Sequence, residues 1–215
     1  MTTATDVNGR FSVDAWAAER GLHIDDMKAA KAVSASILER PVPLCSDFPI
    51  VGELPPGVTA GESGPVGICV SCWQRRPFAA TLLLVPKTVR LGIGCRRGTA
   101  AADIRALADE ALTAHQIHPA AVKTVGSIDL KQDEPGLLAY CRERGWPIEF
   151  YTASQLEAVE GEFTPSDFVR RTTGVDNVCE RAAALGGGEL VIRKTAGRGV
   201  TVAAAIERYE VRFDG

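Results

Sequence analysis

The stretch LGIGCRRGTAAADI, residues 91–104, decides the fold. Its first half mixes apolar residues with Gly92 and Gly94, which is typical of a buried strand. Its second half carries a helical pattern that begins after Thr99, which we expect to be the helix N-cap. Gly98 lies between the two and permits a sharp change of chain direction. The stretch therefore predicts a strand, a tight turn and a helix in direct succession.

The same turn is a candidate anion-binding site. Backbone N–H groups and the positive end of the helix dipole would face one small volume there, and Arg96 and Arg97 add positive charge. The glycine spacing G-x-G-x-x-x-G is one residue longer than the dinucleotide fingerprint, and the Lys-Ser/Thr of a phosphate-binding loop is absent, so nucleotide binding is not favoured. The alternative is that the glycines only permit the turn.

Strands and helices alternate from Thr88 to the end of the chain. Extended runs are VRLGIG, VKTVGSIDL and PIEFYT, and helical patterns cover residues 99–115, 135–145, 153–159, 166–174 and 176–185. The chain closes with GELVIRKT and GVTVAAAIERYEVRF, which are joined by AGR and predict an antiparallel hairpin on one edge. Residues 88–215 are therefore expected to form a layered α/β domain with a mixed, mainly parallel sheet.

The upstream part has a different organisation. Residues 12–40 show a helical pattern that breaks at Gly21, with a second helix expected from about residue 24 to 38. Short extended runs follow, PVPLCSDF, GICVSCW and FAATLLLVPK, with the loop GELPPGVTAGESGP between the first two. Residues 1–87 are therefore expected to form a small α+β module that precedes the α/β domain.

Composition narrows the function classes. The 215 residues include 24 Lys and Arg against 27 Asp and Glu, with a formal net charge of −3, so no general basic field is available for nucleic acid. No apolar run approaches the roughly 20 residues of a membrane-spanning helix, and the polar start does not resemble a signal peptide. We expect a cytoplasmic protein whose six cysteines stay reduced, without membrane or nucleic-acid partners.

A second group of polar residues follows the next predicted strand. The segment SIDLKQDEPG, residues 127–136, should leave the carboxyl end of that strand, where open α/β sheets bind ligands. Its ionisable or hydroxyl side chains are those of Ser127, Asp129, Lys131, Asp133 and Glu134. We expect them near the glycine turn; the alternative is a simple helix entry in which the acids complement the dipole before Pro135.

A third segment supplies two arginines as candidates for ligand binding. In SDFVRRTTGVDNVCERAAAL, residues 166–185, Arg170 and Arg171 end a short helix and Asp176 is expected to cap the next one. Arginine suits bidentate capture of carboxylates, although surface arginines at a helix end are an equal alternative.

Cys69 and Cys72 lie in an extended run without a second such pair, so no metal site is expected.

These motifs resemble, in order, the C-terminal domain of the CbiG-type cobalt-precorrin-5A hydrolases. The resemblance rests on LGIGCRRGT, SIDLKQDEPGLL, SDFVRRTTGVDNVCERAAAL and GELVIRKT with GVTVAAAIER. The same domain occurs alone in CobE-like proteins. Upstream, TTATDVNGRFSVDAWA is similar to the end of the family's N-terminal domain, followed by its central linking region, while most of that N-terminal domain has no counterpart before Met1.

The resemblance implies a role in cobalamin biosynthesis. The expected reaction opens the ring lactone of the corrin intermediate with water and expels a two-carbon fragment as acetaldehyde, giving cobalt-precorrin-5B. No cofactor is expected, because the cobalt is carried by the substrate. The expected partners are the corrin (tetrapyrrole) intermediate and either a separate protein that carries the N-terminal domain or other enzymes of corrin assembly.

Site roles follow as hypotheses. Binding of the substrate's acetate and propionate groups would fall to cations and turn residues, and lactone opening would require a base and an oxyanion site. The substrate-binding candidates are Gly92, Gly94, Arg96, Arg97, Gly98, Thr99, Ser127, Arg170, Arg171 and Lys194. The catalytic candidates are Asp129 or Glu134 as base, Lys131 as electrostatic partner and Cys95 as nucleophile. Thr5, Asp6, Asn8 and Gly9 are further candidates for substrate contact.

Two other functions compete with hydrolysis. One is a non-catalytic, CobE-like carrier of corrin intermediates, and the other is one part of a split hydrolase or a remnant that docks on the missing domain. A base within the basic pocket would favour the enzyme, whereas a pocket with cations alone would favour the carrier. A docking remnant would show an exposed apolar patch near residues 1–16.

Overall fold

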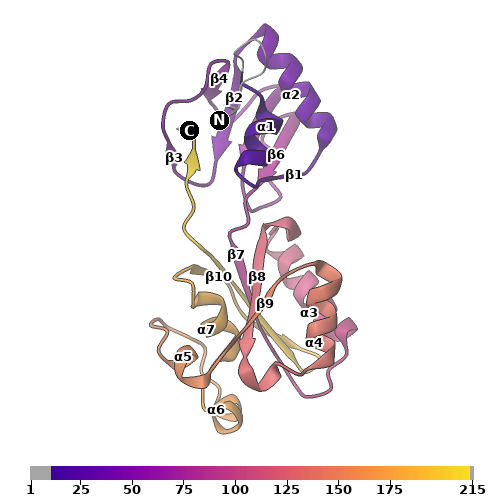
Figure 1. Ribbon diagram of the computed structural model, residues 1–215, viewed down its shortest axis with the longest axis vertical. Coiled ribbons are helices and arrows are strands. Elements are labelled where there is room, and N and C mark those ends of the chain that lie inside the picture. Colours follow the sequence, from indigo (N-terminus) through magenta and orange to yellow (C-terminus); the bar gives the residue numbers. More distant parts are fainter. Residues whose placement is uncertain (1–10, 214–215) are drawn as a thin grey trace. The chain divides into compact units, whose positions relative to one another are not determined.

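The computed structural model describes residues 11–213, which divide into two compact units (Figure 1). The first comprises the described parts of Met1–Lys87 and of Tyr209–Gly215, and the second is Thr88–Arg208. The segment from Tyr209, which the sequence pattern assigned to the second domain, thus belongs to the first unit. The motif with Thr5, Asp6, Asn8 and Gly9 lies outside the described residues.

The second unit is built on a five-stranded mixed sheet. Its strands are β7 (Val89–Cys95), β8 (Val122–Ile128), β9 (Ile148–Tyr151), β10 (Glu189–Gly197) and β11 (Val200–Ile206), in the spatial order β10-β11-β7-β8-β9. The pairs β7/β8 and β8/β9 are parallel, whereas β10/β11 and β11/β7 are antiparallel. The expected α/β layering and the edge hairpin are confirmed.

Helices cover both faces of this sheet (Figure 1). The contacting pair α3 (Ala101–Ala114) and α4 (Pro135–Arg144) lies on one face, where α3 packs on the hairpin strands. On the other face α7 (Val178–Ala184) packs on β7, β8 and β11, with α5 (Ala153–Glu157) against it. The short helix α6 (Asp167–Thr173) precedes α7. Two 3₁₀ turns, Pro119–Ala121 and Asp129–Lys131, flank β8.

Two expected helix caps are wrong. The N-cap of α3 is Ala100, because the Thr99 hydroxyl instead donates to the carbonyl of Arg96 at 2.8 Å and closes the preceding turn. The N-cap of α7 is Asn177, whose side-chain oxygen accepts from the Glu180 amide at 2.9 Å. Asp176, the expected cap, instead pairs with Arg181 at 2.9 Å. In both cases the actual N-cap lies one residue later.

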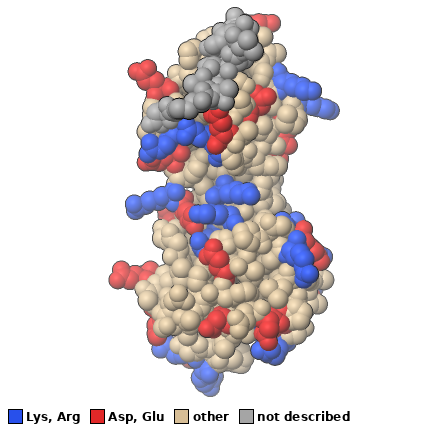
Figure 2. Space-filling model, viewed as in Figure 1, with Lys and Arg blue, Asp and Glu red and all other residues tan. Residues whose placement is uncertain are grey.

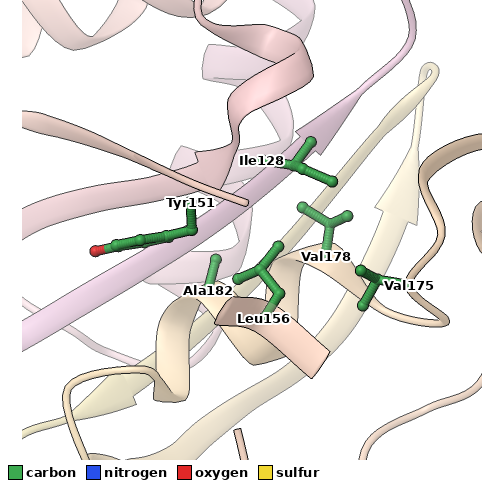
Figure 3. Packing of buried hydrophobic residues seen from close by; sticks show 6 residues of the cluster. All are labelled: Ile128, Tyr151, Leu156, Val175, Val178 and Ala182. Atoms are coloured by element: carbon green, nitrogen blue, oxygen red, sulfur yellow. The ribbon is translucent and has the colours of Figure 1, made fainter. Parts of the chain in front are cut away.

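Gly92 explains how closely α7 approaches the sheet. A Cβ atom at this position would lie 1.8 Å from the carbonyl oxygen of Cys179, so only glycine permits the contact. Beside it, buried side chains from β8, β9, α5 and α7 form one apolar cluster (Figure 3). Figure 3 shows Ile128 directed toward Val178, while the hydroxyl of Tyr151 points away from the cluster. This packing fixes the start of α7 beside the carboxyl ends of the strands.

The first unit contains a second five-stranded sheet of order β1-β6-β5-β2-β4, in which only the β1/β6 pair is antiparallel. Its strands are β1 (His23–Ile24), β2 (Val42–Ser46), β4 (Val58–Ala60), β5 (Val66–Val70) and β6 (Ala80–Val85), and its helices are α1 (Val13–Glu19) and α2 (Met27–Glu39). Two expectations are corrected: residues 23–24 are a strand, so the second helix starts later, and the expected loop contains β4.

The chain returns to the first unit at its end. The short strand β12 (Val211–Arg212) pairs in parallel with β3 (Ile50–Val51). Phe213 stacks on Trp16 with ring centroids 4.7 Å apart, and Phe11 packs edge-on against Phe213. Phe11 and Trp16 are buried, so the described residues near the start show no exposed apolar patch of the kind a docking remnant predicts.

The surface carries both signs of charge. Figure 2 shows basic and acidic side chains scattered over the viewed face among larger uncharged areas. In residues 11–213 no helix combines the length and the apolar character that crossing a bilayer requires.

Candidate functional site

A cavity of about 750 Å³ lies within the second unit, beside the end of β7. Its wall is assembled from segments far apart in sequence: the turn after β7, the 3₁₀ turn after β8, α6, the start of α7 and the β10–β11 hairpin. These segments meet because β11 pairs with β7 up to Cys95, opposite Val200, and because α7 packs on β7. The cavity therefore occupies the carboxyl edge of the sheet, where α/β folds commonly bind ligands.

The charged side chains of the cavity wall are all basic. They are Arg96, Arg97, Lys131, Lys194 and Arg198, and no Asp or Glu lines the cavity in the described part of the chain. Two of these cations have only distant, exposed partners: Arg97 lies 3.5 Å from Asp133, and Arg198 lies 3.9 Å from Asp103. Arg96 and Lys194 form no ion pair with any described carboxylate. Such a wall is suited to a ligand with several negative groups.

The rest of the wall is largely apolar. Ile128, Leu130, Phe168, Val169 and Val178 line it. Leu130 is 51% exposed and Phe168 is 64% exposed, so both present apolar surface at the cavity wall. An apolar surface bordered by cations is the arrangement expected for an amphipathic ligand with an apolar body and an acidic rim.

Two amides of the glycine turn already have acceptors within the protein, so these two do not serve the expected anion cradle. Gly98 has a left-handed φ of +76°, and its amide donates to Oε1 of Glu134 at 2.7 Å. The Arg96 amide donates to the carbonyl of Gly199 at 2.8 Å. Because both amides already have protein acceptors, they are not available to a ligand, and the turn contributes its side chains instead.

The two carboxylates expected to act as base do not line the cavity. Glu134 is 1% exposed, and its second oxygen lies 3.3 Å from Nζ of Lys131. Asp129 is half-buried at the start of the 3₁₀ turn, outside the lining residues. A base must lie within hydrogen-bond reach of the proton it removes, so this geometry does not support the role predicted for either residue.

Two thiols do line the cavity, in a form that is poorly nucleophilic. Burial raises the pKa of Cys95, an effect that the nearby Lys131 only partly offsets. Burial likewise raises the pKa of Cys179 to about 11. Since the thiolate is the reactive form, a nucleophilic role for Cys95 has no electrostatic support here.

The remaining predicted residues separate into two groups. Gly94, Arg96, Arg97, Lys131, Cys95 and Lys194 lie together in the cavity wall. Gly92, Gly98, Thr99, Ser127, Arg170 and Arg171 do not line it. The Ser127 hydroxyl donates to the carbonyl of Ile93 at 2.7 Å and joins two strands, whereas Arg170 is exposed beside Asp176 at 3.3 Å. Arg171 is exposed and donates to the carbonyl of Asp167 at 3.3 Å.

Several lining residues were missed. Arg198 lies at the tip of the hairpin, and Phe168 and Thr172 lie on α6. Both segments were recognised in the sequence, but these residues were not among the predicted site residues. The AGR turn was visible in the sequence, but its position depends on β11 lying beside β7, a pairing that only the three-dimensional structure reveals.

Comparison with known proteins places this unit in a family. Residues 89–205 match the family described as "Cobalamin synthesis G C-terminus". The chain belongs to this family. The matched residues include the whole cavity wall, so the cobalamin synthesis G C-terminal domain of this chain carries the candidate site.

Relatives extend the likeness beyond that domain. The chain is 32% identical over 227 residues to the cobalt-precorrin-5A hydrolase of Salmonella typhimurium, covering 96% of this chain and 63% of the relative. It is 28% identical over 236 residues to the cobalt-precorrin-5A hydrolase of Priestia megaterium, covering 98% of this chain and 62% of the relative. The chain thus spans less than two thirds of these relatives.

A solved structure resembles the family domain. CobE, a protein from the cobalamin biosynthetic pathway, matches with a TM-score of 0.53 and 34% identity, covering 56% of this chain and 91% of CobE. The cobalamin synthesis G C-terminal domain thus resembles both part of longer hydrolases and a shorter protein of the same pathway.

Proposed function

We propose that this protein acts in cobalamin biosynthesis at the cobalt-precorrin-5A hydrolase step, and that the cavity of its second unit binds the corrin intermediate. One observation carries the binding part of the proposal: five cations and no described carboxylate surround a largely apolar cavity. The hydrolase step itself rests on the similarity to cobalt-precorrin-5A hydrolases. A corrin intermediate has the complementary form, an apolar macrocycle with acetate and propionate groups around its rim. The volume of about 750 Å³ lies in the range of small-molecule sites.

The charges explain how such a ligand would be oriented. Arg96 and Lys194 have no described ion-pair partner, so a ligand carboxylate would gain a charge-assisted hydrogen bond without displacing a protein acid. Leu130 and Phe168 present apolar surface to the cavity, and a bound macrocycle would cover this surface. Binding therefore combines burial of apolar area with pairing of charges at the rim.

The reaction would use the same cations. Attack of water on the lactone carbonyl breaks the ring ester and places negative charge on the carbonyl oxygen, which an ammonium or guanidinium group stabilises. Lactone opening gives a carboxylate and a hydroxyl. Loss of the hydroxyl proton then forms the carbonyl group of acetaldehyde as the carbon–carbon bond to the macrocycle breaks, and the electron pair of that bond stays on the macrocycle. We assign the cavity residues to binding and charge stabilisation, and none of them to the base.

A second candidate is a corrin carrier that binds the intermediate without hydrolysis. The all-basic wall favours it, because the described cavity residues include no carboxylate base.

One experiment separates these functions. The purified chain is incubated with cobalt-precorrin-5A, and acetaldehyde release and ligand binding are followed in the same samples. Release of acetaldehyde supports the hydrolase, and binding without release supports the carrier. Absence of both would contradict the proposal.

A further inference from the structure

Glu134 is a buried carboxylate that lies behind the cavity wall. Its exposed fraction is 1%, and it does not line the cavity. Its carboxylate has hydrogen-bonding and charged partners inside the protein. Burying a charged group is costly unless it is paired and hydrogen-bonded, so the contacts of this carboxylate indicate what it does.

Both oxygens of Glu134 bind segments of the cavity wall. Oε1 accepts the Gly98 amide at 2.7 Å, and Oε2 lies 3.3 Å from Nζ of Lys131, whose side chain is 14% exposed. Gly98 belongs to the turn after β7, whereas Lys131 belongs to the 3₁₀ turn after β8. One side chain therefore ties together the connections that follow two neighbouring parallel strands.

The tied turn bears two cations of the wall, Arg96 and Arg97. Its other end is fixed by the bond from the Arg96 amide to Gly199. The segment of Glu134 also packs closely on the turn, since a Cβ atom at Gly136 would lie 2.0 Å from the Thr99 carbonyl oxygen. Without Glu134, the Gly98 amide would be left without its acceptor and Lys131 without its counter-charge.

We propose that Glu134 is a positioning residue, which fixes the turn Cys95–Thr99 and orients Lys131 toward the cavity. The clamp itself rests on the contacts within the unit, and only the identity of the bound ligand rests on the proposed function. The role differs from that of a general base, because a base would have to face the ligand, whereas Glu134 faces the protein.

The first test measures the clamp without any ligand. Hydrogen–deuterium exchange of the peptide covering residues 95–99 is compared in wild type, Glu134→Ala, Glu134→Gln and a matched control, Glu143→Gln. Glu143 lies near the end of α4, the helix whose N-cap is Glu134, and forms an exposed pair with Arg105. We expect Glu134→Ala to accelerate exchange about tenfold, since the Gly98 amide loses its buried acceptor. Glu134→Gln should match wild type, because its side-chain amide oxygen still accepts from the Gly98 amide. Glu143→Gln should also match wild type, because it leaves Glu134 unchanged.

A second readout uses only the conservative variant, in case Glu134→Ala does not fold. Glu134→Gln removes the negative charge beside Lys131, so acetylation of Lys131 by an amine-reactive reagent should become faster than in wild type and in Glu143→Gln. Unchanged acetylation of Lys131 in Glu134→Gln would overturn the proposed contact with Lys131. Unchanged exchange of residues 95–99 in a folded Glu134→Ala would overturn the clamp.

The third readout links the clamp to function. Titration with cobalt-precorrin-5A should show binding weakened about tenfold in Glu134→Ala and restored to within about threefold in Glu134→Gln. Loss of acetaldehyde release in Glu134→Gln with binding retained would instead identify a base and overturn the positioning role. If wild type binds no corrin, the proposed function fails, while the exchange and acetylation results still decide the clamp.

Discussion

At the scale of single residues, cations and apolar side chains of the second unit decide what the cavity can bind. Arg96, Arg97 and Lys131 could be predicted to lie in one cavity wall, because they follow the ends of two neighbouring strands, and Lys194 lies in the same wall from within β10. Arg170 was predicted on the same chemistry but lies outside the cavity. Whether a residue on α6 faces the cavity depends on the rotation of that helix, which its own short sequence does not determine.

Cys95 provides a prediction at this scale. Burial raises the pKa of its thiol, so the neutral form predominates at neutral pH and a covalent step through this sulfur is disfavoured. In Cys95→Ser, corrin binding and any acetaldehyde release should stay within about threefold of wild type. Both quantities are measured with cobalt-precorrin-5A. Loss of release with intact binding would show that the thiol takes part in the chemistry.

At the scale of elements, the pairing of β11 with β7 and the packing of α7 place the cavity wall. The alternation of strands and helices predicted the α/β layers and the hairpin, since these patterns are local. The hairpin's neighbour and the tip residue Arg198 were not predictable, because strand order is set by long-range pairing. The two helix caps are displaced by one residue because the expected cap side chains have other partners: the Thr99 hydroxyl donates to the Arg96 carbonyl within the turn, and Asp176 pairs with Arg181.

The contact between α7 and β7 leads to a stability prediction. Gly92→Ala would place a Cβ atom 1.8 Å from the Cys179 carbonyl oxygen, a backbone atom that cannot move alone. We expect the free energy of unfolding to fall by about 3 kcal/mol. Gly94→Ala on the same strand is the comparison, because its nearest atom is the rotatable Thr201 hydroxyl at 2.7 Å, and a loss of about 1 kcal/mol is expected. Urea denaturation measures both, and equal losses would contradict this packing.

An ion network that joins buried Arg90 to the exposed Glu149 leads to a pH prediction. The hydrogen bond from Tyr151, together with Arg90, holds the pKa of Glu149 below its ordinary value. A carboxylate with a lowered folded-state pKa contributes stability that is fully present above the unfolded-state pKa and is lost as the pH falls through the folded-state value. Glu149→Gln should therefore lower the melting temperature at pH 7 and reduce its decline in acid. Melting curves from pH 7 to pH 3 test this, and parallel curves for the two proteins would contradict it.

At the scale of the whole molecule, the chain forms two α/β units, and the described part of the segment that begins at Tyr209 belongs to the first unit. The division near Thr88 coincides with a change of pattern in the sequence, but the return was not predictable. Residues Val211–Arg212 are too few to show strand periodicity, and their partner Ile50–Val51 is equally short. Each unit has its own five-stranded sheet. The candidate ligand site lies entirely within the second unit.

The most direct test of the account is a titration of the full chain with cobalt-precorrin-5A after two matched charge removals. Arg96→Ala with Lys194→Ala removes two cations of the cavity wall that pair with no carboxylate among residues 11–213, whereas Arg170→Ala with Arg171→Ala removes two cations that do not line the cavity. We predict that the first pair weakens binding about a hundredfold and that the second pair leaves it within about threefold. Equal affinity in the two double variants would contradict the assignment of this cavity as the corrin site.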